Sequence, residues 1–507
     1  MSGDSIPAPR AARDADLISG PYGDLTLFVR RVGELVKGPA ITCPGSARVA
    51  DAARLMSERA VGSIVVKDTA GAPAGIVTDR DLRTRVLAAG LEPGTAVARI
   101  MSSPLVSVAS EASAFDALLE MTRRSIHHLG VLAGGHLTGV VSSHDLLGLQ
   151  AAHPVMTGRR IESAPDIDAL ARAAAGVEGV VRWLVAGGAE ATDIGRIVAE
   201  LNDRLVRRAL GLVEADLEAA GRGRAPVAFS WLVAGSEGRR EQTLKTDQDN
   251  GLVYRDPPPG AEPEVAAYFE HLATAMNETL TRVGFPRCPG DFMAVNPRWR
   301  QPESVWRRYF ASWMETPQPE PVLRASLFFD LRPVGGDEGV GRALWEWACE
   351  TAPARTLFLR HLARAVLDRP RPLGLFGGFA VERTGPHKEG LDLKAGAVLP
   401  VTHAMRVYAL SLGVRDTNTL DRLRAATERG IFGAAEESEL RAAYQFAARL
   451  RLRHQLACLD ASLPPDNFIR PRALGKTDRL LLKEAFKTIA WLERGVAERF
   501  QTGLVPG

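Results

Sequence analysis

Two aspartates and a Gly-Ser pair are the residues of this sequence best suited to chemistry. An apolar run at 227–234 predicts a buried strand, which Gly235-Ser236 ends. Asp247 and Asp249 stand at the start of a second predicted strand, and alternate strand residues project from one face. Two carboxylates on one face can hold one or two hard divalent cations. The spacing therefore predicts a metal-binding strand next to a glycine–serine turn.

The Gly-Ser turn itself predicts a phosphate site. The polar segment that follows is rich in Glu, Arg and Gln and is long enough for one or two helical turns. At a helix N-terminus, backbone N–H groups and a serine hydroxyl can bind a phosphate. A phosphate site beside a metal site is typical of nucleotidyl or phosphoryl transfer. The alternative without chemistry is a strand–turn–strand with a solvated acidic edge.

The whole stretch from 235 to 249, with the pattern G-S-x-G-R-x-E-x(5)-D-x-D, resembles the signature of polymerase-β-like nucleotidyltransferases. It is similar to the version in PII uridylyltransferases and glutamine-synthetase adenylyltransferases. It is closer still to the nucleotidyltransferases that carry CBS domains (DUF294 type). Thr246 stands where Ser is more usual, and it keeps the hydroxyl. The resemblance implies Mg²⁺ or Mn²⁺ at Asp247 and Asp249, with an NTP as substrate. The implied contacts to the NTP phosphates are Gly235, Ser236, Arg239 and Lys245.

An internal repeat precedes this stretch. The pattern G-h-h-[TS]-x-x-D occurs at 75–81 and again at 139–145, each time after a predicted helix and strand. The repeat resembles a tandem CBS pair. That resemblance implies an adenine-nucleotide ligand and a homodimer formed through the pair. The implied adenosine-binding residues are Thr78, Arg80, Asp81, Ser142 and Asp145. Alternatively, the two aspartates are only helix N-caps.

Bulk properties limit the class of protein. A chain of 507 residues is expected to form two to four domains. Its net charge of +3 gives no reason to expect nucleic acid or a membrane surface as a partner. The four cysteines lack metal-type spacing, which favours free thiols, and no apolar run is long enough to span a membrane. We therefore expect a soluble, cytoplasmic protein.

The expected fold class is multidomain α+β, with a polymerase-β-like α/β core and an all-α C-terminal domain. The expected domains are an N-terminal tail and helix (1–37), the tandem CBS pair (38–150), a helical connector (151–222), the nucleotidyltransferase core (223–340) and the helical domain (341–507).

Two further segments supply candidate site residues. The run 324–334 predicts a strand, and Asp330 in it is the candidate for the third carboxylate that nucleotidyltransferases of this fold usually add. The alternative is an aspartate at a sheet edge paired with Arg332. In the Gly-rich segment 385–396, Lys388 and Lys394 could meet a triphosphate or an acidic protein substrate, or could be solvated loop lysines. On a later predicted helix, His454 and Gln455 have no evident chemical partner.

Together the residues and the resemblance indicate a signalling enzyme that moves UMP or AMP from an NTP to an acceptor protein, as PII uridylyltransferases do. In that scheme Asp330 completes the second metal site and helps to deprotonate the acceptor. Adenine nucleotide at the CBS pair regulates the transfer. The alternatives are a non-catalytic CBS energy sensor that binds a partner protein and a small-molecule nucleotidyltransferase.

Overall fold

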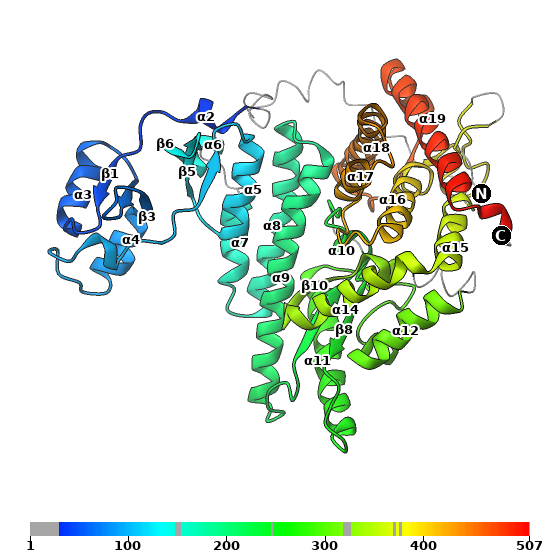
Figure 1. The fold of residues 1–507 in the computed structure, drawn as a ribbon, viewed down its shortest axis with the longest axis horizontal. Helices are drawn as coiled ribbons and strands as arrows, with labels where there is room; N and C mark the ends of the chain where they lie inside the picture. Colours follow the sequence, from blue (N-terminus) through cyan, green and yellow to red (C-terminus); the bar gives the residue numbers. More distant parts are fainter. Residues whose placement is uncertain are drawn as a thin grey trace, which may run out of the picture. The chain divides into compact units, whose positions relative to one another are not determined.

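A computed structural model describes the chain from residue 30 to residue 505, except for 148–153, 245–246, 318–325, 369–371 and 375–377. Figure 1 shows its fold. The described residues divide into a smaller unit, made of 30–159 with 186–188, and a larger unit, made of 160–185 and 189–505. Each unit is described by itself.

The smaller unit contains two copies of one arrangement. In each copy the first strand pairs in parallel with the second, and the second pairs in antiparallel with the third. The equivalent pairs are Thr42 with Val65 and Ser107 with Gly130. This confirms the repeat predicted from the sequence. The elements are α2 (Val32–Leu35), β1 (Thr42–Pro44), α3 (Val49–Glu58), β2 (Ser63–Lys67), β3 (Pro73–Thr78), α4 (Asp79–Asp81), η1 (Leu82–Leu87), η2 (Val97–Arg99), β4 (Ser107–Ala109), α5 (Ala114–Arg124), β5 (His128–Ala133), β6 (His136–Ser142) and α6 (Ser143–Leu147).

Helix packing in the smaller unit follows the apolar spacing of the sequence. In α3, Val49, Ala52 and Met56 are buried at intervals of three and four residues, so they share one face. That face packs on Ile64 and Val66 of β2 in a single apolar cluster. Each sheet is therefore covered by its own helix.

The predicted helical connector consists of three helices. They are α7 (Pro154–Glu162), α8 (Ile167–Ala186) and α9 (Ala191–Ala219). The long helix α9 packs against β10 and α11 of the nucleotidyltransferase core. The connector therefore covers one face of the catalytic sheet.

The core of the larger unit is a four-stranded sheet in the order β10-β7-β8-β9. Its strands are β7 (Phe229–Val233), β8 (Asn250–Tyr254), β9 (Arg300–Pro302) and β10 (Arg332–Gly336), and only the β8–β9 pair is parallel. The strand predicted at 227–234 is confirmed as β7. The helices around the sheet are α10 (Gly235–Gly238), α11 (Glu262–Val283), η3 (Pro297–Trp299), α12 (Glu303–Glu315), η4 (Ser326–Asp330) and α14 (Glu338–Thr351).

Both faces of the sheet are covered, because its strands are apolar on both sides. On one face, Phe269 of α11 contacts the rings of Phe229 and Tyr254, with centroids 5.3 and 4.5 Å away. On the other face, Trp306 of α12 donates a hydrogen bond to the Leu252 carbonyl at 3.1 Å. Trp306 and Phe310 are fully buried, so these aromatic side chains of α12 belong to the core.

The C-terminal part is a bundle of helices, as predicted (Figure 1). Its apolar core is continuous with that face of the sheet, since Leu232 and Val253 belong to the same cluster as Val401 and Leu482. Within the described part of the chain, no helix is long and apolar enough to cross a membrane. The elements are η5 (Ala352–Ala354), α15 (Thr356–Leu367), β11 (Leu391–Asp392), η6 (Lys394–Val398), α16 (Leu399–Ser411), α17 (Thr419–Glu428), α18 (Ala434–Asp460), β12 (Phe468–Ile469), η7 (Pro471–Ala473), α19 (Lys476–Arg499) and η8 (Thr502–Leu504).

Two of the predicted strand positions are wrong. Asp330 ends the short 3₁₀ helix η4, and β10 begins only at Arg332. Asp247 and Asp249 precede β8, which begins at Asn250. In both places the acidic residues belong to the connection next to a strand, where Asp247 reaches solvent and the buried Asp330 reaches its arginine partners.

Candidate active site

The Gly-Ser turn lies directly against the Asp249 carboxylate. Gly235 has a φ of +60°, a conformation that favours glycine. A Cβ at this position would lie 3.0 Å from Asp249 Oδ2 and 2.7 Å from Leu327 Cδ1. The Ala234 N–H also donates to the Asp249 carbonyl at 2.9 Å. The glycine therefore allows the turn to pass close to the acid, and Ser236 follows it immediately.

The Asp249 carboxylate has an unfavourable environment for its charge. Its pKa is raised to about 6, chiefly by burial and to a smaller extent by the negative charge of Asp247, while the Cys288 hydrogen bond, Lys394 and Arg239 oppose the shift. Asp247 is exposed and Asp249 is half-buried. A divalent cation bound beside Asp249 would stabilise its ionised form.

Cys288 is a neighbour of the acidic pair that the sequence interpretation did not assign. Its thiol hydrogen-bonds to the Asp249 carboxylate, and burial raises the pKa of the thiol. The spacing of the acidic motif could not indicate this thiol, because Cys288 lies 39 residues after Asp249.

Lys394 is the predicted lysine that reaches the site. It begins the π-helical segment η6, directly after β11 and Leu393. Its pKa is lowered by burial and by the charges of Arg451 and Arg239, and the acidic pair partly opposes this shift. Lys388 is exposed in the preceding loop, and Lys245 lies outside the described residues. Lys394 is therefore the cation that the helical domain brings toward the acidic pair.

A narrow pocket lies between the Ser236 turn and Lys394, and neither Asp247 nor Asp249 is among its described lining residues. Its volume is about 40 Å³, far below the roughly 300–1,000 Å³ of ordinary ligand pockets, so this pocket is too small for an NTP. The lining includes Ser236, Arg239, Gln242, Lys394, Tyr444 and Arg451.

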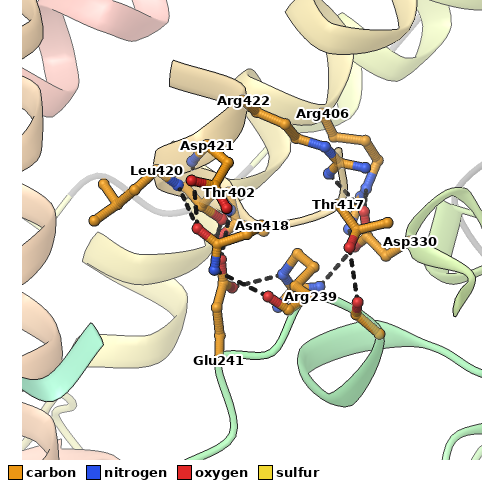
Figure 2. Close-up of polar contacts among 12 residues, drawn as sticks. Arg239, Glu241, Asp330, Thr402, Arg406, Thr417, Asn418, Leu420, Asp421 and Arg422 are labelled. Atoms are coloured by element: carbon orange, nitrogen blue, oxygen red, sulfur yellow. Dashed lines mark hydrogen bonds and ion pairs between the residues drawn. The ribbon is translucent and has the colours of Figure 1, made fainter. Parts of the chain in front are cut away.

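Asp330 and Arg239 do not have their predicted roles in this structure. Asp330 is fully buried, and Figure 2 shows it among the guanidinium groups of Arg239, Arg406 and Arg422. The contacts to its two oxygens are 2.6 Å from Arg239 Nη1, 3.0 and 2.5 Å from Arg406 Nε and Nη2, and 2.6 Å from Arg422 Nη1. Burial alone would raise the pKa of Asp330, but the three arginines hold it well below its usual range. Both oxygens are thus committed to arginines, which leaves none for a metal ion.

We call these four residues the arginine cluster. Arg239 also donates to Glu241 at 2.7 Å, so its charge is balanced by two buried carboxylates and is not free for a phosphate. The alternative partner considered for Asp330, Arg332, instead makes a bidentate contact with Asp203 of α9 at 2.6 and 2.7 Å. Both sequence-based interpretations of Asp330 are therefore replaced.

Two further residues of the signature, Gly238 and Arg239, connect the catalytic core to the helical domain. A Cβ at Gly238 would lie 1.9 Å from the Asp330 carbonyl oxygen, so only glycine allows this packing. The loop before α17 hydrogen-bonds to the same segment. Thr417 donates to the Gly238 carbonyl at 2.8 Å, and Asn418 donates to the Arg239 carbonyl at 3.0 Å (Figure 2). This segment is thus structural.

Glu237 is a buried acid that the sequence analysis missed. Burial, and then the charge of Asp203, raises its pKa to about 8, and Arg332 partly opposes the shift. No described group hydrogen-bonds to its Oε1. Burial therefore favours the protonated form of the Glu237 carboxyl.

In the smaller unit, the two predicted adenosine motifs differ. Thr78 and Asp81 form a capping box, with Thr78 Oγ1 donating to Asp81 Oδ2 at 2.7 Å. Ser142 and Asp145 repeat it at 2.5 Å, so each aspartate supports the cap from the first turn of the helix, and the hydroxyl residue, not the aspartate, stands at the N-cap position. Asp145 Oδ1 is additionally paired with Lys37 at 2.6 Å.

Only the first motif opens into the large cleft described in this unit. The cleft has a volume of about 730 Å³ and includes Thr78, Arg80 and Asp81 in its lining. His127 and His128 of the second repeat contribute the opposite wall. The structure therefore brings three of the five predicted CBS residues to one cleft and leaves Ser142 and Asp145 outside its lining.

Family models match three separate parts of the chain. The family model described as "Putative nucleotidyltransferase DUF294" matches residues 175–320, and its "Putative nucleotidyltransferase substrate binding domain" matches 356–500. The CBS domain model matches 32–88 and 97–152. The fold and the site thus define a nucleotidyltransferase domain joined to a CBS pair and a helical substrate-binding domain. The chain belongs to the CBS-linked nucleotidyltransferases of the DUF294 family.

Individual relatives match only part of the chain. The CBS domain-containing protein CBSCBSPB3 of Arabidopsis thaliana is 34% identical over 150 residues, which cover 29% of this chain and 26% of the relative. Inosine-5'-monophosphate dehydrogenase of Mycobacterium leprae is 30% identical over 198 residues, covering 36% of each chain. A crystal structure of a CBS domain protein from Pyrobaculum aerophilum complexed with AMP is 29% identical, covers 24% of this chain and 94% of that one, and has a TM-score of 0.23. The chain spans about a quarter of the length of the first curated relatives.

Proposed function

We propose that this protein transfers a nucleoside monophosphate, UMP or AMP, from an NTP to a hydroxyl of an acceptor protein and releases pyrophosphate. The observation that supports this most is the close approach of Asp249 to the Gly235-Ser236 turn, with Lys394 facing the same carboxylate. Acidic metal ligands, a hydroxyl and a cation are thereby gathered around one small volume.

The donor set fits a hard divalent cation. Asp247 and Asp249 offer carboxylate oxygens, and the raised pKa of Asp249 reflects burial and repulsion that a cation would relieve. When bound there, Mg²⁺ or Mn²⁺ supplies the positive charge that neutralises the triphosphate and the leaving pyrophosphate.

The protein's own groups position the substrate. The Ser236 hydroxyl can donate to a phosphate oxygen, and the Lys394 ammonium can offset its charge. Helix α10 has only four residues, so its dipole contributes little, and the side chains carry the phosphate contact. Asp330 takes no part in deprotonating the acceptor, because the arginines saturate it.

Adenine nucleotide at the CBS pair is proposed to regulate the transfer. The cleft in the smaller unit exceeds the volume that a nucleotide needs, and it presents a hydroxyl, a carboxylate and several arginines, including Arg80 and Arg83. These groups suit a ribose and a phosphate, respectively. Because of the cleft lining, the Thr78–Asp81 motif is the ligand site that we propose, and Ser142–Asp145 serves as a helix cap.

The test is incubation of the full chain with each α-labelled NTP, Mg²⁺ and a cell lysate, followed by separation of labelled proteins. We expect label on one acceptor, and a loss of about 10²-fold or more in Asp249→Asn, the scale of removing one electrostatic group from a site. The control is Asp216→Asn, an exposed aspartate on α9. Equal labelling by both variants would refute the assignment of the acidic pair. Labelling of small molecules alone would favour the small-molecule alternative, and no labelling with any NTP would favour the CBS sensor.

A further inference from the structure

A second group of potential ligands lies in the helical domain, outside the pocket described above. His454 and Cys458 are four residues apart on α18, so both side chains project from one face of the helix. Asp466 lies in the following loop, before β12. The ligand atoms of these three residues all lie within 4.8 Å of one another.

Their hydrogen bonding shows that the three side chains converge on one point. His454 Nε2 is 2.7 Å from Asp466 Oδ1 and 3.5 Å from Cys458 Sγ. A nucleophilic Cys-His-Asp triad would use the two different ring nitrogens, one for the thiol and one for the carboxylate. Here the same nitrogen faces both partners, which is the arrangement of ligands around a common ion. Cys458 is also buried, unlike a nucleophile that must reach a substrate.

The sulfur-to-nitrogen distance matches a tetrahedral zinc site, and the nitrogen-to-oxygen distance must open to fit one. His454 Nε2 and Asp466 Oδ1 are 2.7 Å apart, a hydrogen-bond distance that would widen to about 3.4 Å around an ion. With Zn–S near 2.3 Å and Zn–N near 2.0–2.1 Å, the sulfur-to-nitrogen edge of a tetrahedron is about 3.6 Å. The observed separation between Cys458 Sγ and His454 Nε2 is 3.5 Å. Mg²⁺ and Ca²⁺ prefer oxygen ligands only, so the mixed sulfur, nitrogen and oxygen set selects Zn²⁺ or a similar borderline cation.

An access route is present as well, and a second histidine lies beside Asp466. His387 Nδ1 is 3.8 Å from Asp466 Oδ2, and its ring stacks on Phe468 at 3.9 Å between centroids. The side chains of His454, Asp466 and His387 are 25%, 36% and 38% exposed, so an ion can enter from solvent. The Phe468 N–H donates to Asp466 Oδ1 at 2.8 Å and fixes the carboxylate, as groups around metal ligands do.

We propose that Cys458, His454 and Asp466, completed by water, bind one Zn²⁺. The ion ties α18 to the loop before β12. Strand β12 pairs with β11, with Ile469 opposite Leu391, and the Leu393 N–H donates to the Asn467 carbonyl at 2.9 Å, one residue before Lys394. The zinc site thus anchors the strand pair from which Lys394 enters the active site.

Co²⁺ substitution tests this in the full chain. We expect the chelator-stripped, reduced protein to bind one equivalent of Co²⁺ with a thiolate-to-cobalt charge-transfer band, and Zn²⁺ to displace it. Cys458→Ser should abolish the band. The matched control is Cys288→Ser, which removes the thiol beside the acidic pair and should leave the band intact. In a thermal melt, Zn²⁺ should raise the Tm of the wild type and of Cys288→Ser but not of Cys458→Ser.

His454→Gln provides an independent variant, because glutamine still reaches Asp466 by hydrogen bonding but is a poor zinc ligand. We expect it to weaken Co²⁺ binding by more than the roughly 10- to 100-fold typical of losing a residue that only supports a ligand. A wild-type titration without a thiolate band would overturn the proposal whatever the variants do. So would a band that survives in Cys458→Ser and disappears in Cys288→Ser.

Discussion

Replacing Asp330 by asparagine should destabilise the larger unit strongly, because the arginine cluster would lose its only anion at the centre. The change keeps the shape of the side chain and removes the charge. Arg239 would retain Glu241, and Arg422 would retain the carbonyl oxygens of Asp416 and Phe329 at 2.7 and 3.0 Å. The contacts found for the Arg406 guanidinium are both with Asp330, so it would be left buried beside two other cations.

The magnitude follows from these contacts. Removing one partner of a buried ion pair costs about 3–5 kcal/mol, because the remaining charge stays buried and uncompensated. Three arginines share this carboxylate, so we expect at least the upper part of that range. With a urea m-value of about 2–3 kcal/mol/M, a loss of about 4 kcal/mol lowers the unfolding midpoint by about 1–2 M.

The loss should not depend on pH between about 5 and 8. The folded-state pKa of Asp330 is held below its unfolded value, so its contribution to stability is fully present above the unfolded pKa and is lost only at acidic pH, as the pH falls through the folded value. The assay is urea unfolding followed by tryptophan fluorescence. Glu346→Gln, which removes an exposed ion pair with Arg415, is the control and should shift the free energy of unfolding by less than about 1 kcal/mol.

A partial rescue separates charge from shape. Adding Arg406→Leu to the asparagine variant removes the least compensated cation and should recover part of the lost stability, which a double-mutant cycle would report as coupling. If the Asp330→Asn variant unfolds at the wild-type midpoint and loses metal-dependent NTP binding, the reasoning is refuted, and Asp330 is a metal ligand after all.

Three further predictions concern the other sites. Lys394→Met should weaken Mg²⁺-dependent binding of a non-hydrolysable NTP by about tenfold or more in calorimetry, since it removes a charge-assisted contact worth roughly 1.5–3 kcal/mol; unchanged affinity would exclude Lys394 from the phosphate site. Wild-type stability should fall as the pH rises from about 5 to 8. The folded-state pKa of Glu237, about 8, lies above its unfolded value, so over this range the unfolded state ionises and gains stability relative to the folded state. The urea midpoints of Glu237→Gln should lack this part of the slope. AMP, ADP or ATP titrated into the full chain should bind more weakly to Asp81→Asn by roughly tenfold to hundredfold, whereas Asp145→Asn should bind like the wild type; the reverse order would move the ligand to the second motif.

The domain order was predictable because its signals are local. The repeat of G-h-h-[TS]-x-x-D, the apolar run of β7 and the helical periodicity after residue 341 each depend on neighbours within about twenty residues. All three are confirmed by the structure and by the family matches. The homodimer, the acceptor protein and the choice of NTP remain predictions, since they depend on molecules other than this chain.

The roles of charged residues were less predictable because their partners are distant in sequence. Asp330 lies in a run of residues with high β-propensity, and this local pattern predicts a strand carboxylate that faces a cleft. Its partners lie 91 residues before it and 76 and 92 residues after it, and no periodicity announces them. Similarly, His454 has no partner along its own helix except Cys458, and its contact with Asp466 arises only because the chain turns back after α18.

The nucleotidyltransferase signature combines two physical roles that the pattern alone does not separate. Gly235, Ser236 and Asp249 shape the catalytic volume, whereas Gly238 and Arg239 are held by the helical domain through Asp330, Thr417 and the arginines of α16 and α17. Lys394 reaches the same volume from that helical domain. The two halves are only a few residues apart, so a displacement of the helical domain shifts Lys394 relative to Asp249 and also acts on the Ser236 turn through Gly238 and Arg239. The contact between the two domains is therefore a place where the geometry of the site can be controlled.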